Sequence, residues 1–256
     1  MKKIILLLML IISIQQADIL NKAGKYFIYY GYNRATYSNS NIHFKGNTYN
    51  YTLYNVQAKD RQSNLAWKYL IEITIPQYNF RIGYFLDDTQ NISIGVDHMK
   101  YVVKVPQKTK INGTDHQGHM HNNNTIELNN FLAFEHTDGL NYINISYNKF
   151  YPIWENKLKM QAVSLFVGGG AGIMFPRSNV TLIGYKSRND KFKIAGYGAD
   201  VQGGANYDFT KNFFLRTEFK AGYIDMPYIA TTNSSKDTAS QNFTFFEYSL
   251  SIGYQF

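Results

Sequence analysis

The sequence predicts an all-β protein: an eight-stranded antiparallel up-and-down transmembrane β-barrel, with a ten-stranded barrel as the alternative. Three observations predict this fold. Several segments of about 10 residues alternate apolar and polar side chains, as barrel strands do. The connections between these segments alternate between short and long. The chain also ends on a strand with a large apolar side chain at every second position up to Phe256.

The alternation is clearest in "FLRTEFKAGY", where Leu215, Phe219 and Tyr223 share one parity. Arg216 and Lys220 share the other, and successive side chains of a strand point to opposite faces. Similar segments are "NFRIGYF", "NISIGVDHM", "YINISYN" and "KIAGYGADVQGGANY", with "YFIYYGYNRATYS" and "QAVSLFVGGGAGI" less regular. Together they predict strands at about 25–38, 77–87, 90–104, 139–151, 158–175, 191–208, 211–230 and 242–256.

The connections between these strands have two lengths, which is typical of barrels with tight turns at one end and long loops at the other. The short ones are 87–90, 151–157 and 208–212. The long ones are 39–76, 105–138, 176–190 and 231–241, and we expect 39–76 and 105–138 to lie outside the cell. Within 39–76, "IHFKGNTYNYTLY" with its "KGN" turn and "IEITI" predict a hairpin above the membrane, or the two extra strands of a ten-stranded barrel.

Composition agrees with this fold. Aromatic residues make up 16% of the 256 residues, which favours pleated surfaces. The mean hydropathy of −0.33 fits a barrel because half of each strand faces the lumen. There is no cysteine, so disulfides, thiolate metal sites and a cysteine nucleophile are excluded. The net charge of +8 suits anionic lipid headgroups, and no motif indicates nucleic acid.

The N-terminus predicts a cleaved secretory signal over residues 1–17, followed by the barrel over 18–256. Lys2 and Lys3 precede an unbroken apolar run from Ile4 to Ile12, and a short polar stretch reaches Ala17. That run is too short to cross a membrane as a helix, so export is the better interpretation.

The two faces of the strands predict which side meets lipid. The apolar parity holds almost no charge and is rich in Tyr, Phe, Ile, Leu and Val, as a lipid-facing band requires. The other parity combines charged residues with glycines, which suits a narrow lumen filled by side chains. We expect these charges to form an interior salt-bridge network: Arg81, Asp97, Asp200, Arg216, Glu218, Lys220 and Glu247.

The signal "MKKIILLLMLII", the strand alternation and the closing "YSLSIGYQF" resemble small Gram-negative outer-membrane β-barrels of the OmpX/OmpA-like class. The segments "FRIGYFLDDTQNISIGVDHMKYV" and "FEHTDGLNYINI" look like uncharacterised Bacteroidetes-type barrels. The resemblance implies an integral outer-membrane location and a final strand that the assembly machinery recognises. The residues that match this assembly signal are Tyr248, Leu250, Ile252, Tyr254 and Phe256.

A histidine-rich stretch, "DHQGHMHNNN", lies in the second predicted external loop. His116, His119 and His121, with Asp115, offer imidazole and carboxylate ligands to Zn²⁺, Cu²⁺ or Ni²⁺. The alternative is a solvated loop tip, which the surrounding asparagines favour, and we expect no cofactor.

A second cluster offers weak catalytic candidates. His136 and Asp138 precede the strand at 139–151, and His98 lies near the same rim. An acyl-transfer site would also need a serine or threonine nucleophile, and spacing assembles no triad. We therefore expect a structural or interaction role, with a narrow porin-like channel or a lipid-modifying enzyme as alternatives. The expected partners are outer-membrane lipid, lipopolysaccharide (which the basic stretch 104–110 could touch) and the assembly machinery; the expected state is a monomer.

Overall fold

The computed structural model describes residues 21–61, 77–156, 158–184 and 191–256, apart from the side chains of Asn130, Thr137 and Asp138. The predicted signal peptide and the "IEITI" segment lie outside the described residues. Eight long strands form the barrel: β1 (Tyr26–Tyr37), β5 (Tyr78–Phe85), β6 (Gln90–Val103), β9 (Leu132–Asn156), β10 (Gln161–Met174), β12 (Gly196–Asp208), β13 (Phe213–Ala230) and β14 (Thr238–Gln255).

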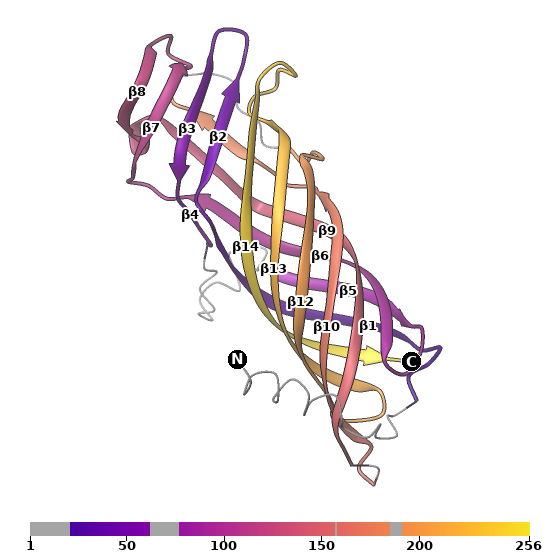
Figure 1. Cartoon of the computed structure of the whole chain (residues 1–256). Coiled ribbons are helices and arrows are strands. Elements are labelled where there is room, and N and C mark those ends of the chain that lie inside the picture. The colour runs from indigo at the N-terminus through magenta and orange to yellow at the C-terminus, as the bar shows by residue number, and fades with distance from the viewer. Residues whose placement is uncertain (1–20, 62–76, 157, 185–190) are drawn as a thin grey trace, which may run out of the picture.

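These eight strands close into an antiparallel ring in chain order, β1-β5-β6-β9-β10-β12-β13-β14 (Figure 1). The seam is the pairing of β1 with β14, from Phe27 opposite Gln255 to Tyr37 opposite Phe245. At its end, the Tyr26 N–H donates to the Phe256 carbonyl oxygen at 3.0 Å, and the reverse bond is 2.9 Å. The eight-stranded prediction is therefore confirmed, and the ten-stranded alternative is wrong.

The outer and inner faces of the barrel have opposite polarity to those of a soluble protein. Large apolar side chains are exposed all round the wall, among them Ile94 on β6, Ile145 on β9 and Val201 on β12. Charged and amide side chains such as Arg81 and Lys220 are buried inside it. Exposed apolar area of this extent needs an apolar solvent, so the barrel spans a membrane. No helix in the described residues is long and apolar enough to cross a bilayer.

Beyond one end of this band, the segments predicted as loops form more sheet. The further elements are β2 (Ser40–Lys45), β3 (Asn50–Val56), β4 (Ala58–Lys59), β7 (Lys108–Thr114), β8 (Met120–Glu127), the 3₁₀ turn η2 (Leu128–Asn130) and β11 (Asn179–Leu182). The first part of β14 pairs with β2, and the sheet continues β2-β3-β7-β8 (Figure 1). The expected hairpin is confirmed as β2–β3. The long connection predicted over 105–138 contains β7, β8, η2 and the start of β9, for which the sequence had indicated no strands.

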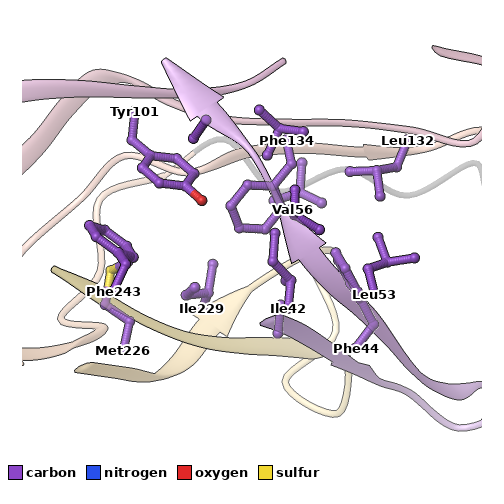
Figure 2. Packing of buried hydrophobic residues seen from close by; sticks show 14 of the residues in the cluster. Ile42, Phe44, Leu53, Val56, Tyr101, Leu132, Phe134, Met226, Ile229 and Phe243 are labelled. Atoms are coloured by element: carbon purple, nitrogen blue, oxygen red, sulfur yellow. The ribbon is translucent and has the colours of Figure 1, made fainter. Parts of the chain in front are cut away.

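We call this region the cap: β2, β3, β4, η2, β7, β8 and β11, with the ends of β6, β9, β13 and β14 that adjoin them. A hydrophobic core fills the cap and continues into the adjoining end of the barrel (Figure 2). Ile42, Phe44 and Leu53 from the β2–β3 hairpin are fully buried, and Phe134 from β9 packs edge-on against Phe44 at 5.9 Å between ring centroids. Alternation on β2, and on β3 as far as Leu53, points one apolar face of the hairpin into this core.

We expect Phe134→Ala to loosen the cap while leaving the barrel closed. Phe134 is 2% exposed, and removing a buried phenyl ring costs about 3–5 kcal/mol. Hydrogen exchange of the β2 and β3 amides should accelerate, while the β10 and β12 amides stay protected. The matched control is Phe219→Ala, at a lipid-facing ring that is 55% exposed. Equal effects of the two substitutions on the cap amides would contradict a role for the buried Phe134 ring in stabilising the cap.

Candidate functional site

The half of the lumen nearer the cap holds a charge network centred on Asp97. Its carboxylate accepts both hydrogen bonds of the Arg81 Nη2 group at 3.0 Å and a further bond from the Lys220 ammonium. Arg81 Nη1 also donates to the Asn144 side-chain oxygen at 2.7 Å. Arg81, Asp97 and Lys220 are at most 1% exposed, so one anion balances two buried cations.

The other predicted lumen carboxylates surround this centre with different partners. Glu247 accepts a hydrogen bond from the Asn79 amide at 2.6 Å, and Glu218 lies 3.6 Å from the Lys220 ammonium. Asp200 accepts the Tyr142 hydroxyl proton at 2.9 Å instead of pairing with a cation. The structure places all three carboxylates inside the barrel, and the partner of Asp200 is an uncharged hydroxyl group.

Arg216 is inside the lumen as predicted but outside the Asp97 network. Its guanidinium lies 4.8 Å from the Phe166 ring centroid and 4.9 Å from that of Tyr29, and its Nε donates to the Asn206 oxygen at 3.3 Å. Such cation–π contacts stabilise a cation that has left water. The rings around it belong to one buried aromatic cluster, which we call the aromatic plug: Phe27, Tyr29, Phe85, Phe150, Phe166 and Phe214.

Inward glycines make room for the aromatic plug. A Cβ on Gly83 would lie 2.2 Å from the Phe27 ring, and one on Gly253 would lie 2.1 Å from the Phe214 ring. The sequence pattern placed glycines and charged residues together on the polar parity. At these two positions the glycines leave space for rings that fill the lumen.

Lys22 completes the short-turn end and was not predicted. Its ammonium donates to the Asp208 carboxylate at 2.7 Å and lies 5.3 Å from the Phe85 ring centroid. The backbone N–H groups of Lys22 and Ala23 both donate to Asp88 Oδ1. Lys22 precedes the first alternating segment, so no periodicity could place it in the lumen.

The described part of the lumen is therefore closed at both ends by packed side chains. The aromatic plug and the Lys22–Asp208 pair fill the short-turn end, and the cap core covers the other. Between them lie the Asp97 network and its amide partners. The described lumen is therefore filled along its length by buried side chains.

His136 is buried in the cap, away from any surface. Its Nδ1 lies 2.8 Å from the Ser178 hydroxyl, and its Nε2 lies 3.2 Å from the Gln241 amide nitrogen. Burial lowers the pKa of His136 to about 3, so the ring is neutral. Ser178 supplies the hydroxyl that spacing could not, but it is only 3% exposed. The pair lies inside the cap and connects β9 to the residue before β11.

The remaining catalytic candidates do not join His136. His98 stacks on Tyr78 with 4.8 Å between ring centroids, and its Nδ1 lies 2.7 Å from the Asn141 side-chain oxygen. Tyr78 and His98 follow the lipid-facing parity of their strands, whereas His136 follows the inward one. The side chain of Asp138 lies outside the described residues.

The predicted metal-binding histidines separate into two environments. His119 and His121 approach the Asp115 carboxylate at 3.5 and 2.8 Å. His116 turns inward, where its Nδ1 meets the Tyr51 hydroxyl and its Nε2 the Ile183 carbonyl, both at 3.1 Å. The pKa of His116 is lowered, chiefly because the ring is buried and its charged form loses hydration. Over the described ranges, no group of three or more His, Cys, Asp or Glu side chains has an arrangement that could hold a metal ion.

The predicted assembly signal lies on the lipid-facing side of β14. Its five side chains are between 39% and 60% exposed, while Glu247, Ser249 and Gln255 point into the lumen. The parity prediction for the last strand is confirmed. Recognition of these residues by assembly machinery stays a prediction.

Comparisons with known proteins assign no role to the chain. No family model matches the chain, and no curated protein matches it. Among solved structures it is similar to the attachment invasion locus protein Ail of Yersinia pestis (11% identity, TM-score 0.36, 91% of this chain and 99% of Ail). It is also similar to the outer membrane protein OprG of Pseudomonas aeruginosa (11%, 0.41, 93% and 99%) and the outer membrane protease OmpT of Escherichia coli (8%, 0.35, 94% and 99%).

The location of the chain follows from its own geometry. An even number of antiparallel strands, an exposed apolar band, a polar lumen and tight turns at one end are the features of bacterial outer-membrane barrels. The chain is an integral outer-membrane β-barrel protein.

Asp97→Asn should destabilise the barrel more than any other single carboxylate change in the lumen. It leaves Arg81 and Lys220 buried without their shared anion, and breaking a buried pair costs about 3–5 kcal/mol. The free energy of unfolding in urea, measured in lipid vesicles, checks this. Asp200→Asn is the matched control and should cost less, because Asp200 accepts from the neutral Tyr142 hydroxyl. Equal losses would contradict the central role of Asp97.

Acidification should loosen the cap through His136. The imidazole has a pKa of about 6.5 in unfolded chains and about 3 when buried here. The folded cap therefore binds this proton less readily, so its stability is full above about pH 6.5 and falls as the pH drops towards 3. The loss at pH 5 is about 2 kcal/mol.

Hydrogen exchange of the amides from Leu132 to His136, compared at pH values corrected for intrinsic rates, measures this loss. His136→Gln keeps hydrogen-bonding groups near Ser178 and removes the titration, so its cap should depend less on pH. The same pH dependence in both proteins would show that His136 is not the titrating group.

Proposed function

We propose that the protein is a cell-surface interaction module: a sealed barrel that anchors a folded cap, which contacts anionic ligands outside the cell. The observation that supports this best is the contrast between the two ends. The segments predicted to be loops contribute to a buried hydrophobic core, while the lumen is filled by the Asp97 network and the aromatic plug. A barrel built this way holds a surface in place.

The orientation of the cap supports an external role. The connections at the opposite end are tight, such as 86–89 between β5 and β6 and 209–212 between β12 and β13. In outer-membrane barrels the short turns face the periplasm and the long connections face outward. The cap is then the part of the protein that meets the environment.

The solvent face of the cap is basic and contains an aromatic ring. Lys108 and Lys110 on β7 are exposed, and Tyr54 lies opposite Lys110 on β3. With Thr109, Thr125 and Asn55 they line a hollow of about 240 Å³. Among the described residues, the acidic group that pairs with these lysines is Glu127, 3.8 Å from the Lys108 ammonium with both side chains largely exposed. An aromatic ring beside two ammonium groups suits an anionic sugar.

A polyanion-binding measurement tests the proposal. Purified full-length protein should bind dextran sulfate, with affinity that falls as salt rises because exposed charges are screened. Lys108→Gln combined with Lys110→Gln should weaken binding about tenfold. Lys149→Gln combined with Lys211→Gln, an equal charge loss at the short-turn end, should leave it unchanged. Equal losses in the two double variants would reduce the effect to net charge and contradict a cap site.

Single-channel recording tests the channel alternative directly. Planar bilayers containing the protein should stay silent, because the aromatic plug and the cap core fill the two ends of the described lumen. Stable unitary conductance in the wild-type protein would overturn the sealed-barrel assignment.

A further inference from the structure

Two hollows meet on the outside of the wall where the apolar band ends and the cap begins. The first, which we call the rim groove, has a volume of about 750 Å³ and lies across β12, β13, β14 and the end of β1. The second, the basic hollow, has a volume of about 800 Å³ and lies between β1, β4 and β6. Both are lined by Thr36 and Tyr37, so they adjoin across one strand.

The rim groove results from small side chains set between large ones. Ala199, Ala221 and Thr244 form its floor, and Tyr223 and Phe246 form walls that are 45% and 46% exposed. In the register, Ala221 lies between Val201 and Phe246, and Tyr223 lies between Ala199 and Thr244. All of these residues belong to the lipid-facing parity. The groove is therefore apolar and suits a hydrocarbon chain as its ligand.

Polar groups fix the level of the groove in the membrane. Just beyond it on the same face, the Tyr197 hydroxyl donates to Asp225 at 2.9 Å, and Asn242 on β14 is exposed. Side chains of this kind belong with headgroups and not with hydrocarbon. The groove therefore ends where an outer-leaflet lipid changes from acyl chain to headgroup.

The basic hollow lies at that headgroup level. Four cationic residues and one acidic residue line it: Arg34, Lys59, Arg61 and Lys104, with Asp60. Arg34 Nε binds Asp60 at 2.6 Å, which neutralises that pair, and Arg61 reaches Glu135 only at 3.7 Å with its own side chain 56% exposed. Lys59 and Lys104 are exposed, and neither forms an ion pair with any described residue.

We infer that the rim groove and the basic hollow form one binding site for a phosphorylated lipid of the outer leaflet. One acyl chain lies over Ala199 and Ala221, and a headgroup phosphate is held by Lys59 and Lys104. The inference depends on the two hollows being adjacent. The apolar groove alone would accept any acyl chain, and the basic hollow alone would accept any phosphate, but together they fit a molecule that has both groups. The site rests on the proposed outward orientation of the cap, and it uses none of the residues assigned to the cap hollow.

Retention of lipid by the purified full-length protein tests this site. The protein is reconstituted in phosphatidylcholine nanodiscs with a minor fraction of diphosphorylated lipid A, and retained lipid A is quantified by native mass spectrometry. Lys59→Gln with Lys104→Gln, and separately Ala199→Leu with Ala221→Leu, should each reduce retention about tenfold. Dephosphorylated lipid A should be retained weakly and should not respond to the lysine substitutions.

The control is Lys108→Gln with Lys110→Gln, which removes the same charge elsewhere on the cap and should keep retention unchanged. Heat-dependent gel mobility checks that every variant is folded. If the Ala199→Leu, Ala221→Leu double variant does not fold, the single Ala221→Leu variant replaces it in the retention measurement. Unchanged retention in either site variant, or an equal loss in the control, would overturn the lipid site. Displacement of lipid A by inorganic pyrophosphate would also overturn it, because the hollow would then bind free phosphate. The dextran sulfate and conductance measurements are independent of each of these outcomes.

Discussion

The pairing of β1 with β14 is the constraint on which the rest of the structure depends. Hydrocarbon offers no hydrogen-bond partners, so each backbone group at membrane depth must be satisfied within the sheet. The seam does this over eleven registered positions and ends with reciprocal bonds between Tyr26 and Phe256. Once the first and last strands are joined, the alternation of side chains decides what faces lipid and what must be neutralised inside.

The buried charges inside the barrel are stabilised in two different ways along the barrel axis. Near the cap, Asp97 is shared by Arg81 and Lys220, and amides complete the remaining bonds. Nearer the short turns, Arg216 lies among aromatic rings instead of carboxylates. Both arrangements remove cations from water, but the second also fills the lumen with apolar volume. Both levels of the lumen are therefore occupied by buried side chains, but through different interactions.

Features that depend on alternation were predictable from the sequence, and features that depend on long-range pairing were not. Side chains along a strand alternate between its two faces. This alternation was enough to predict the eight strands, their lipid-facing sides and the inward position of Arg81, Asp97 and Lys220. Apart from the β2–β3 hairpin, the cap was not predictable in this way, because β7 and β8 are short, and β7 pairs with β3, which is distant in the chain, while β8 pairs only with β7 among the described strands. His136 was singled out for its neighbours in sequence, whereas its actual partners, Ser178 and Gln241, come from a separate segment and from another strand.

The change of partner along β14 explains how one sheet produces both an anchor and a surface. β1 ends at Tyr37, and Ser38 closes the pairing: its N–H donates to the Thr244 carbonyl and its hydroxyl accepts from the Thr244 N–H, both at 3.0 Å. β2 then continues along the same edge of β14 from Gln241 to Thr238. Because this break falls at the upper limit of the lipid-facing band, β2 and β3 are free to turn their apolar faces onto β9 and β11. The cap is therefore a continuation of the seam, and its position above the membrane is set by where β1 stops.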